Sequence, residues 1–168
     1  GDQHHPQPAV VSISQVTELG TVYGVDEIAA LADAVHEAGL TLHLDGARIA
    51  NAAAALGGDL RSFTTDAGVD VLTFGGTKNG LMYGEAVVFL EPELGERARF
   101  VRKQTTQLAS KMRYIGAQFA TALGDGLWLR NAAHENAMAQ RLAAAAEAVD
   151  GVHVAQEVQA NAVFATMP

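Results

Sequence analysis

The sequence has no cysteine, few basic residues and no long apolar run, and each shortage excludes a class of protein. Without cysteine, its 168 residues cannot form a disulfide, a thiolate zinc site or a cysteine nucleophile. The 11 Lys and Arg residues against 19 Asp and Glu residues give a formal net charge of -8, which argues against nucleic acid as a partner. No apolar run approaches the roughly 18 residues of a membrane span, and no signal-peptide pattern is visible. We therefore expect a cytoplasmic location, without membrane contact.

What is present is typical of an ordinary globular domain. Hydrophobic residues make up 49% of the chain and charged residues 18%, and the length suffices for a substantial core. The basic residues are unevenly distributed, because six of the eleven fall in one short segment. They are Arg97, Arg99, Arg102, Lys103, Lys111 and Arg113. This segment is either a solvated helix face or a site for a small anion such as a phosphate group.

The hydrophobic pattern predicts an α/β fold with a mostly parallel sheet. Strands are expected at residues 9–16, 40–45, 69–74 and 85–90, with helices at 27–40 and about 47–56. Asp26 is a plausible N-cap of the first helix, and Gly39 would end it. Only about ten residues separate the third and fourth strands, too few for a helical crossover, so the fourth should be antiparallel. Residues 92–149 read as almost entirely helical, and a short β segment follows Gly151.

Three polar residues fall where a parallel sheet places its ligands, outside the carboxyl ends of the strands. Asp45 ends the second strand, Arg48 begins the next helix, and Lys78 follows the third strand in the stretch "GGTKNG". Neighbouring strands bring such ends together, so the three residues are expected to share a cleft. The glycines around Lys78 would permit backbone conformations that side chains forbid.

Lysine, aspartate and arginine at such an edge suit pyridoxal phosphate chemistry. The lysine amine forms a Schiff base with the cofactor, the aspartate pairs with the pyridinium nitrogen, and the arginine holds a substrate carboxylate. Plainer interpretations stay open at this point. Lys78 could be a turn residue, Asp45 a helix cap, and Arg48 could pair with Asp45 or Asp59.

The stretches "LHLDGARIANAAAALG" and "DVLTFGGTKNG" strongly resemble the low-specificity threonine aldolases. These are β-eliminating lyases that use pyridoxal phosphate and have the aspartate-aminotransferase type of fold, fold type I. The resemblance extends from "SISQVTELGTVY" through "LASKMRYIGAQFATALGDGLWLRNAAHENAMAQRLA". It implies that residues 1–126 are the later part of the cofactor-binding large domain, with its mostly parallel sheet and flanking helices. Residues 127–168 would then begin a small carboxyl-terminal domain.

The resemblance also implies roles for single residues. Lys78 would be the Schiff-base lysine, Asp45 the pyridinium partner and Arg48 the residue that binds the substrate carboxylate. Thr17 would lie near the cofactor ring, and Thr77 would neighbour its phosphate. The basic segment corresponds to a region that offers positive residues to the phosphate in an adjacent subunit. The candidates there are Lys103, Lys111 and Arg113.

The implied reaction is aldol cleavage of threonine or allo-threonine to glycine and an aldehyde, in a homo-oligomer such as a dimer or tetramer. The glycine-threonine phosphate cradle and the ring-stacking histidine of the family cannot be placed here, so we expect part of a longer protein that is inactive alone. His43 is expected to be packed or to support the site indirectly, and His36, His134 and His153 to be structural or on the surface. No metal-ligand spacing is apparent, at His4 and His5 included.

Two alternatives remain open at the level of sequence. An aminotransferase or another β-eliminating lyase could keep the same lysine and aspartate. A binding or assembly domain on a degenerate fold would make Lys78 a simple turn residue.

Overall fold

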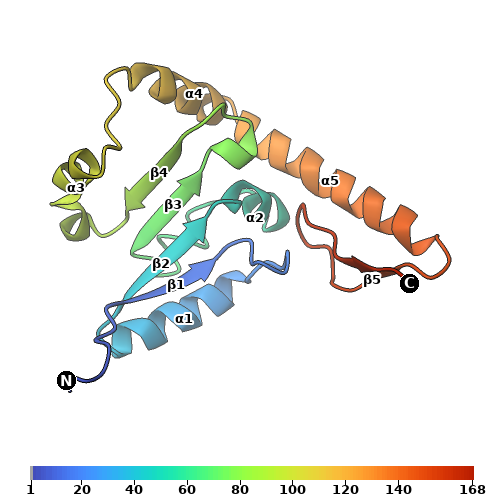
Figure 1. Ribbon diagram of the computed structural model, residues 1–168, viewed down its shortest axis with the longest axis horizontal. Coiled ribbons are helices and arrows are strands. Elements are labelled where there is room, and N and C mark those ends of the chain that lie inside the picture. Colours follow the sequence, from blue (N-terminus) through green and yellow to red (C-terminus); the bar gives the residue numbers. More distant parts are fainter. Residues whose placement is uncertain (1) are drawn as a thin grey trace.

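The computed structural model describes residues 2–168 and has the predicted mixed α/β architecture (Figure 1). One four-stranded sheet has the strand order β1-β2-β3-β4, in which the first three strands are parallel and β4 is antiparallel to β3. The antiparallel fourth strand confirms the inference from the short connection. The bounds are β1 Val10–Ser14, β2 Thr41–Gly46, β3 Val71–Gly75 and β4 Glu85–Phe89.

Helices connect and flank these strands, and a small hairpin closes the described chain. The longer helices are α1 Val25–Glu37, α2 Ile49–Ala55, α3 Ala98–Gln104, α4 Arg113–Gly124 and α5 Leu127–Glu147. The 3-10 helices are η1 Thr77–Asn79 and η2 Pro92–Gly95, and the hairpin pairs β5 His153–Val154 with β6 Ala165–Thr166. The prediction of nearly continuous helix was wrong for residues 105–112. None of the helices in residues 2–168 is long and apolar enough to cross a membrane.

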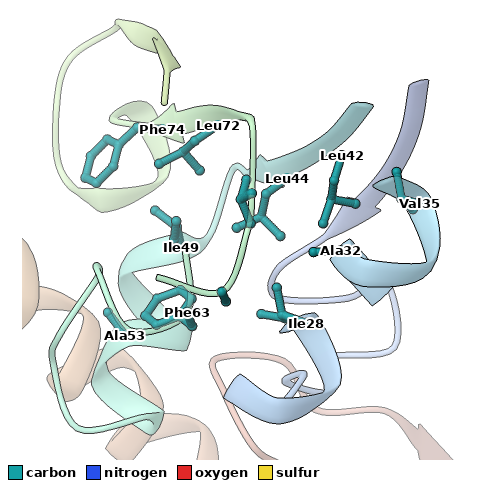
Figure 2. Packing of buried hydrophobic residues seen from close by; sticks show 12 residues of the cluster. Ile28, Ala32, Val35, Leu42, Leu44, Ile49, Ala53, Phe63, Leu72 and Phe74 are labelled. Atoms are coloured by element: carbon teal, nitrogen blue, oxygen red, sulfur yellow. The ribbon is translucent and has the colours of Figure 1, made fainter. Parts of the chain in front are cut away.

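The main core lies between one face of the sheet and helices α1 and α2 (Figure 2). Alternate residues of a strand point to the same face, so Leu42 and Leu44 of β2 join Leu72 and Phe74 of β3 on the covered side. Phe63, from the segment between α2 and β3, is fully buried among them. Burying these side chains is the main favourable term for folding this layer and fixes the register of β2 against β3.

The opposite face of the same strands is more polar. It carries His43 and Asp45 on β2 and Thr73 on β3, all of them partly exposed. The Ser12 hydroxyl lies 2.8 Å from Nδ1 of His43, across the β1–β2 pair. His43 therefore has a hydrogen-bond partner on the same face of the sheet as Asp45.

Both ends of α1 have a clear physical cause, but the N-cap is not the predicted residue. The cap is Gly24, whose backbone N–H donates to Oε2 of Glu27 at 2.7 Å. That bond places Asp26 inside the first turn, so the predicted cap was wrong by two residues. At the other end Gly39, with φ of 70°, adopts the left-handed conformation and its N–H donates to the carbonyl of His36.

The Glu27 contact gives a testable prediction of modest size. Glu27→Ala should lower the free energy of unfolding by about 1 kcal/mol, because it leaves the Gly24 N–H without its partner. Glu37→Ala, in the last turn of the same helix, is the control and should have no effect or stabilise slightly, since a negative charge is unfavourable there. Urea denaturation of both variants measures the difference. Equal losses would contradict the capping role.

Candidate active site

Asp45 occupies the carboxyl end of the central strand β2, with Ser14 beside it on β1 and Thr73 beside it on β3. Its Oδ1 accepts hydrogen bonds from the Ala47 N–H at 3.0 Å and, more weakly, from the Thr73 hydroxyl at 3.4 Å. None of the described residues donates a hydrogen bond to its Oδ2. The carboxylate is therefore fixed by one oxygen and keeps the other for a ligand.

Lys78 lies in η1, three residues beyond the end of β3. Its side chain is exposed, and within residues 2–168 it forms no ion pair. Its turn, in contrast, is held on both sides. The N–H groups of Gly76 and Thr77 donate to the two oxygens of Glu85 at 3.2 and 3.3 Å, and the side chain of Asn79 donates to the Trp128 carbonyl at 2.8 Å. A free amine thus stands on a fixed backbone.

The glycines before and after Lys78 serve two different purposes. A Cβ atom on Gly75 would lie 2.4 Å from the carbonyl oxygen of Ala47, and one on Gly76 would lie 2.6 Å from that of Gly84. These two glycines therefore allow close backbone contact. Only Gly80, with φ of 99°, has the left-handed backbone that was predicted for the group. The contact at Gly75 brings the loop after Asp45 directly against the loop before Lys78.

Arg48 forms the N-cap position of α2 and is exposed. The structure contains neither of the ion pairs considered from the sequence, since Arg48 pairs with no carboxylate among the described residues. Asp59 instead accepts from the backbone N–H of Arg61. The guanidinium can donate two parallel N–H···O hydrogen bonds to one carboxylate, and it thus remains available for an external carboxylate.

The two predicted threonines differ in how they are used. Thr17 follows β1, and its hydroxyl lies 2.7 Å from that of Thr21 within a tight loop. Thr77 directly precedes Lys78, and its hydroxyl oxygen accepts from the Gly84 N–H at 3.3 Å, which leaves its proton free to donate. Both residues lie beyond carboxyl ends of parallel strands. Their assignments as cofactor neighbours stay predictions.

Lys103, one of the predicted phosphate residues of the basic segment, lies away from the Lys78 turn. Lys103 is in α3, which follows the end of β4, and that end pairs with Val71 at the opposite end of β3 from Lys78. Figure 1 shows α3 and α5 at opposite ends of the molecule. Lys111 and Arg113 are also exposed, and Arg113 lies over the ring of Tyr114. The roles of Lys103, Lys111 and Arg113 toward the phosphate of an adjacent subunit stay predictions.

Two residues around the site were missed by sequence reasoning. Thr73 lies beside Asp45, and Glu85 holds the backbone before Lys78. Thr73 could have been found from the strand register, because its side chain must point to the same face as that of Asp45. Glu85 had no such signal, since its role depends on β4 folding back beside Gly75.

The remaining histidines have structural or peripheral places. His36 lies 2.9 Å from Oδ2 of Asp70, which also accepts from the Leu42 N–H. His134 is exposed on α5 and His153 is exposed on β5. His4 and His5 are exposed near the beginning of the chain.

The donor set at this edge fits pyridoxal phosphate. A carboxylate oxygen without a partner suits a protonated ring nitrogen, and an unpaired primary amine suits an aldehyde. The backbone after Asp45 and the backbone before Lys78 are in close contact, at the strand edge where such ligands bind.

Comparison with known proteins agrees with the architecture and with the sequence motifs. The chain is 48% identical to the low specificity L-threonine aldolase of a Pseudomonas species over 166 residues, which is 99% of this chain and 48% of that protein. It is also 48% identical to the enzyme of the same name from Pseudomonas aeruginosa, over 97% of this chain and 47% of that protein. A solved structure of a Leishmania major threonine aldolase superimposes with a TM-score of 0.89 at 36% identity, covering 98% of this chain and 48% of that one.

The chain therefore spans about half the length of the relatives it matches. The family comparison covers all of it, because the beta-eliminating lyase family matches residues 1–168. With the fold, the motifs and this match in agreement, the chain belongs to the beta-eliminating lyase family.

Proposed function

We propose that this chain is part of a pyridoxal phosphate-dependent lyase that cleaves a β-hydroxy-α-amino acid to glycine and an aldehyde. The observation that carries the proposal is the junction at the end of β2 and β3. There the backbone that follows Asp45, at Ala47, lies directly against the backbone that precedes Lys78, at Gly75, while both functional groups remain without an ionic partner in residues 2–168. The relatives named as threonine aldolases supply the reaction class.

Three residues would hold the cofactor and the substrate. Asp45 would hold the pyridinium N–H through Oδ2, Lys78 would bind the aldehyde carbon through its amine, and Arg48 would bind the substrate carboxylate. When bound, pyridoxal phosphate supplies an electron sink for the electron pair left on Cα. Thr17 and Thr77 are proposed neighbours of the ring and the phosphate, respectively.

The chain's own contacts suit each task. Ala47 and Thr73 hold Oδ1 of Asp45, so its Oδ2 has a defined position and the negative charge is available to keep a ring nitrogen protonated. Glu85 and Asn79 fix the backbone around Lys78, while its long side chain stays free to move between bonding partners. Arg48 precedes a helix whose first residues are buried, so the backbone that carries its side chain is held in place as well.

The overall change conserves every atom. For threonine, the Cα–Cβ bond breaks, the β-hydroxyl gives up its proton and acetaldehyde leaves. Cα then takes up a proton and the product is glycine.

The proposed activity belongs to a longer protein that assembles into a homo-oligomer. Lys103, Lys111 and Arg113 would face the cofactor phosphate of a neighbouring subunit, and residues 127–168 would begin a second, smaller domain. The 168-residue chain alone would be inactive, because the glycine-threonine phosphate cradle of the family cannot be placed in its sequence. A cytoplasmic location remains a prediction.

A product assay on the longer protein tests the proposal. With pyridoxal phosphate added, threonine and allo-threonine should each give glycine and acetaldehyde in equal amounts, measured by amino-acid analysis and by an aldehyde-trapping reagent. A keto acid would point to an aminotransferase, and a keto acid with ammonia to an elimination reaction. Either product would overturn the assignment as an aldolase, and absence of any cofactor-dependent product would favour a binding or assembly domain.

A further inference from the structure

Side chains of helix α5 hold two segments of the proposed site, the Lys78 turn and the start of α2. The Asn131 amide donates to the carbonyl of Asn79, the residue after Lys78, at 3.1 Å. Asn79 returns a bond from its own amide to the Trp128 carbonyl at 2.8 Å. Gly80 leaves room for this contact, because a Cβ atom there would lie 3.0 Å from the Asn131 amide nitrogen. The asparagine and glycine of "TKNG" are thus explained by α5.

The same helix holds the element that begins with Arg48. Asn51 of α2 is only 1% exposed, and its amide donates to Glu135 at 3.0 Å and to Asn136 at 3.1 Å. Asn136 donates back to the Asn51 carbonyl at 3.0 Å. Asn51 lies three residues after Arg48, within the first turn of α2, so these bonds fix the orientation of the helix start.

The residues of α5 that make these contacts form one stripe. Asn131 and Glu135 are separated by four positions and therefore lie on the same face of the helix, with Asn136 beside them. Small buried alanines, Ala132 and Ala139, let α5 pack closely along this line. We define Asn131, Glu135 and Asn136 as the amide stripe.

The geometry points to the amide stripe as a positioning device, which sets Lys78 and Arg48 at a fixed separation for the reaction proposed above. It rests on that proposed function. One end of the stripe contacts the Lys78 turn and the other contacts the start of α2, so these two segments share one rigid support. Asparagine is a poor residue for packing alone, and Asn79 is buried with an amide oxygen that accepts no hydrogen bond in the described residues. Its donor, and not its packing, accounts for its presence.

The stripe predicts a division of kinetic effects that plain structural support would not produce. Asn131→Ala releases the Lys78 turn, so kcat should fall about 10-fold or more while KM changes little, since displacements of an ångström can cost up to about 100-fold. Asn51→Ala frees the start of α2, so KM should rise about 10-fold while kcat changes little. Gln140→Ala is the matched control: its amide also bonds a carbonyl, that of Val158, but no element of the site.

A second readout does not depend on catalysis. Hydrogen exchange of the cofactor-free protein should show faster exchange of the Asn79 and Leu81 amides in Asn131→Ala, because both bond to the Gly76 carbonyl within the turn. Gln140→Ala should leave that exchange unchanged. If Asn131→Ala does not fold, Asn131→Ser, which retains a donor, replaces it and should show smaller changes in the same direction.

The outcomes are distinct. Faster exchange together with the divided kinetic effects supports the positioning role. Unchanged exchange in Asn131→Ala, or equal changes of kcat and KM in both variants, overturns it. Failure of the proposed function is recognised separately, because the unaltered protein would then yield no glycine and no aldehyde, and the positioning role would fall with it.

Discussion

Lys78→Ala should abolish cleavage of threonine in the longer protein, with a loss of at least about 10³-fold, since removal of a covalent nucleophile commonly costs more than that. The reason is local. Lys78 is the lysine at the carboxyl edge of the parallel strands, and its amine has no ionic partner among residues 2–168. Stability should barely change, because the side chain is exposed.

The measurement is a reduction experiment. The protein is incubated with pyridoxal phosphate, reduced with borohydride and digested, and the peptides are analysed by mass spectrometry. A pyridoxyl group on Lys78, absent from Lys78→Ala, would establish the attachment site. An unmodified Lys78 in the active protein would return it to the status of a turn residue.

Two further variants sharpen this result. Lys78→Arg keeps the positive charge but lacks a primary amine, so it should be as inactive as Lys78→Ala. Recovery of activity in Lys78→Arg would show that charge alone matters. Arg141→Ala, an exposed residue of α5, serves as a control for a lost positive charge and should retain full activity.

Gly75→Ala should lower the free energy of unfolding by about 1–3 kcal/mol and should also impair cleavage. The added methyl group would lie 2.4 Å from the carbonyl oxygen of Ala47 and 2.7 Å from its Cα. These are backbone atoms of the loop that follows Asp45, so the clash cannot be relieved by a side-chain rotation. Separating the two loops would shift Asp45 away from Lys78.

Gly116→Ala provides the matched control for this substitution. Gly116 is inside α4, and a Cβ atom there would have nothing within 4 Å. The same chemical change should therefore stabilise the protein by about 0.5–1 kcal/mol, because alanine favours a helix interior over glycine. Urea denaturation and the product assay on both variants measure the contrast. Equal stability of the two would show that the close approach at Gly75 carries no constraint.

Much of the fold could be predicted from local sequence patterns. Alternating and continuous apolar runs marked the four strands of the main sheet, and the short connection before Glu85 required an antiparallel fourth strand. Errors arose where a local signal had a competitor. The preference of aspartate for the cap position predicts Asp26 there, but Glu27 reaches back to Gly24 and the helix starts earlier. The segment 105–112 carried no strong helix breaker, yet it lies outside the helices.

The sequence by itself determined which residues stand at the carboxyl ends of the parallel strands, because strand order along the chain and period-two alternation are local properties. Asp45, Arg48 and Lys78 were identified in this way. Only the tertiary structure decided what holds them. Glu85 meets the Lys78 turn only after β4 folds back. Helix α5 meets Asn51 and Asn79 from 84 and 52 positions away. Hydrogen bonds between such distant segments depend on packing of whole elements, and no local pattern encodes that packing.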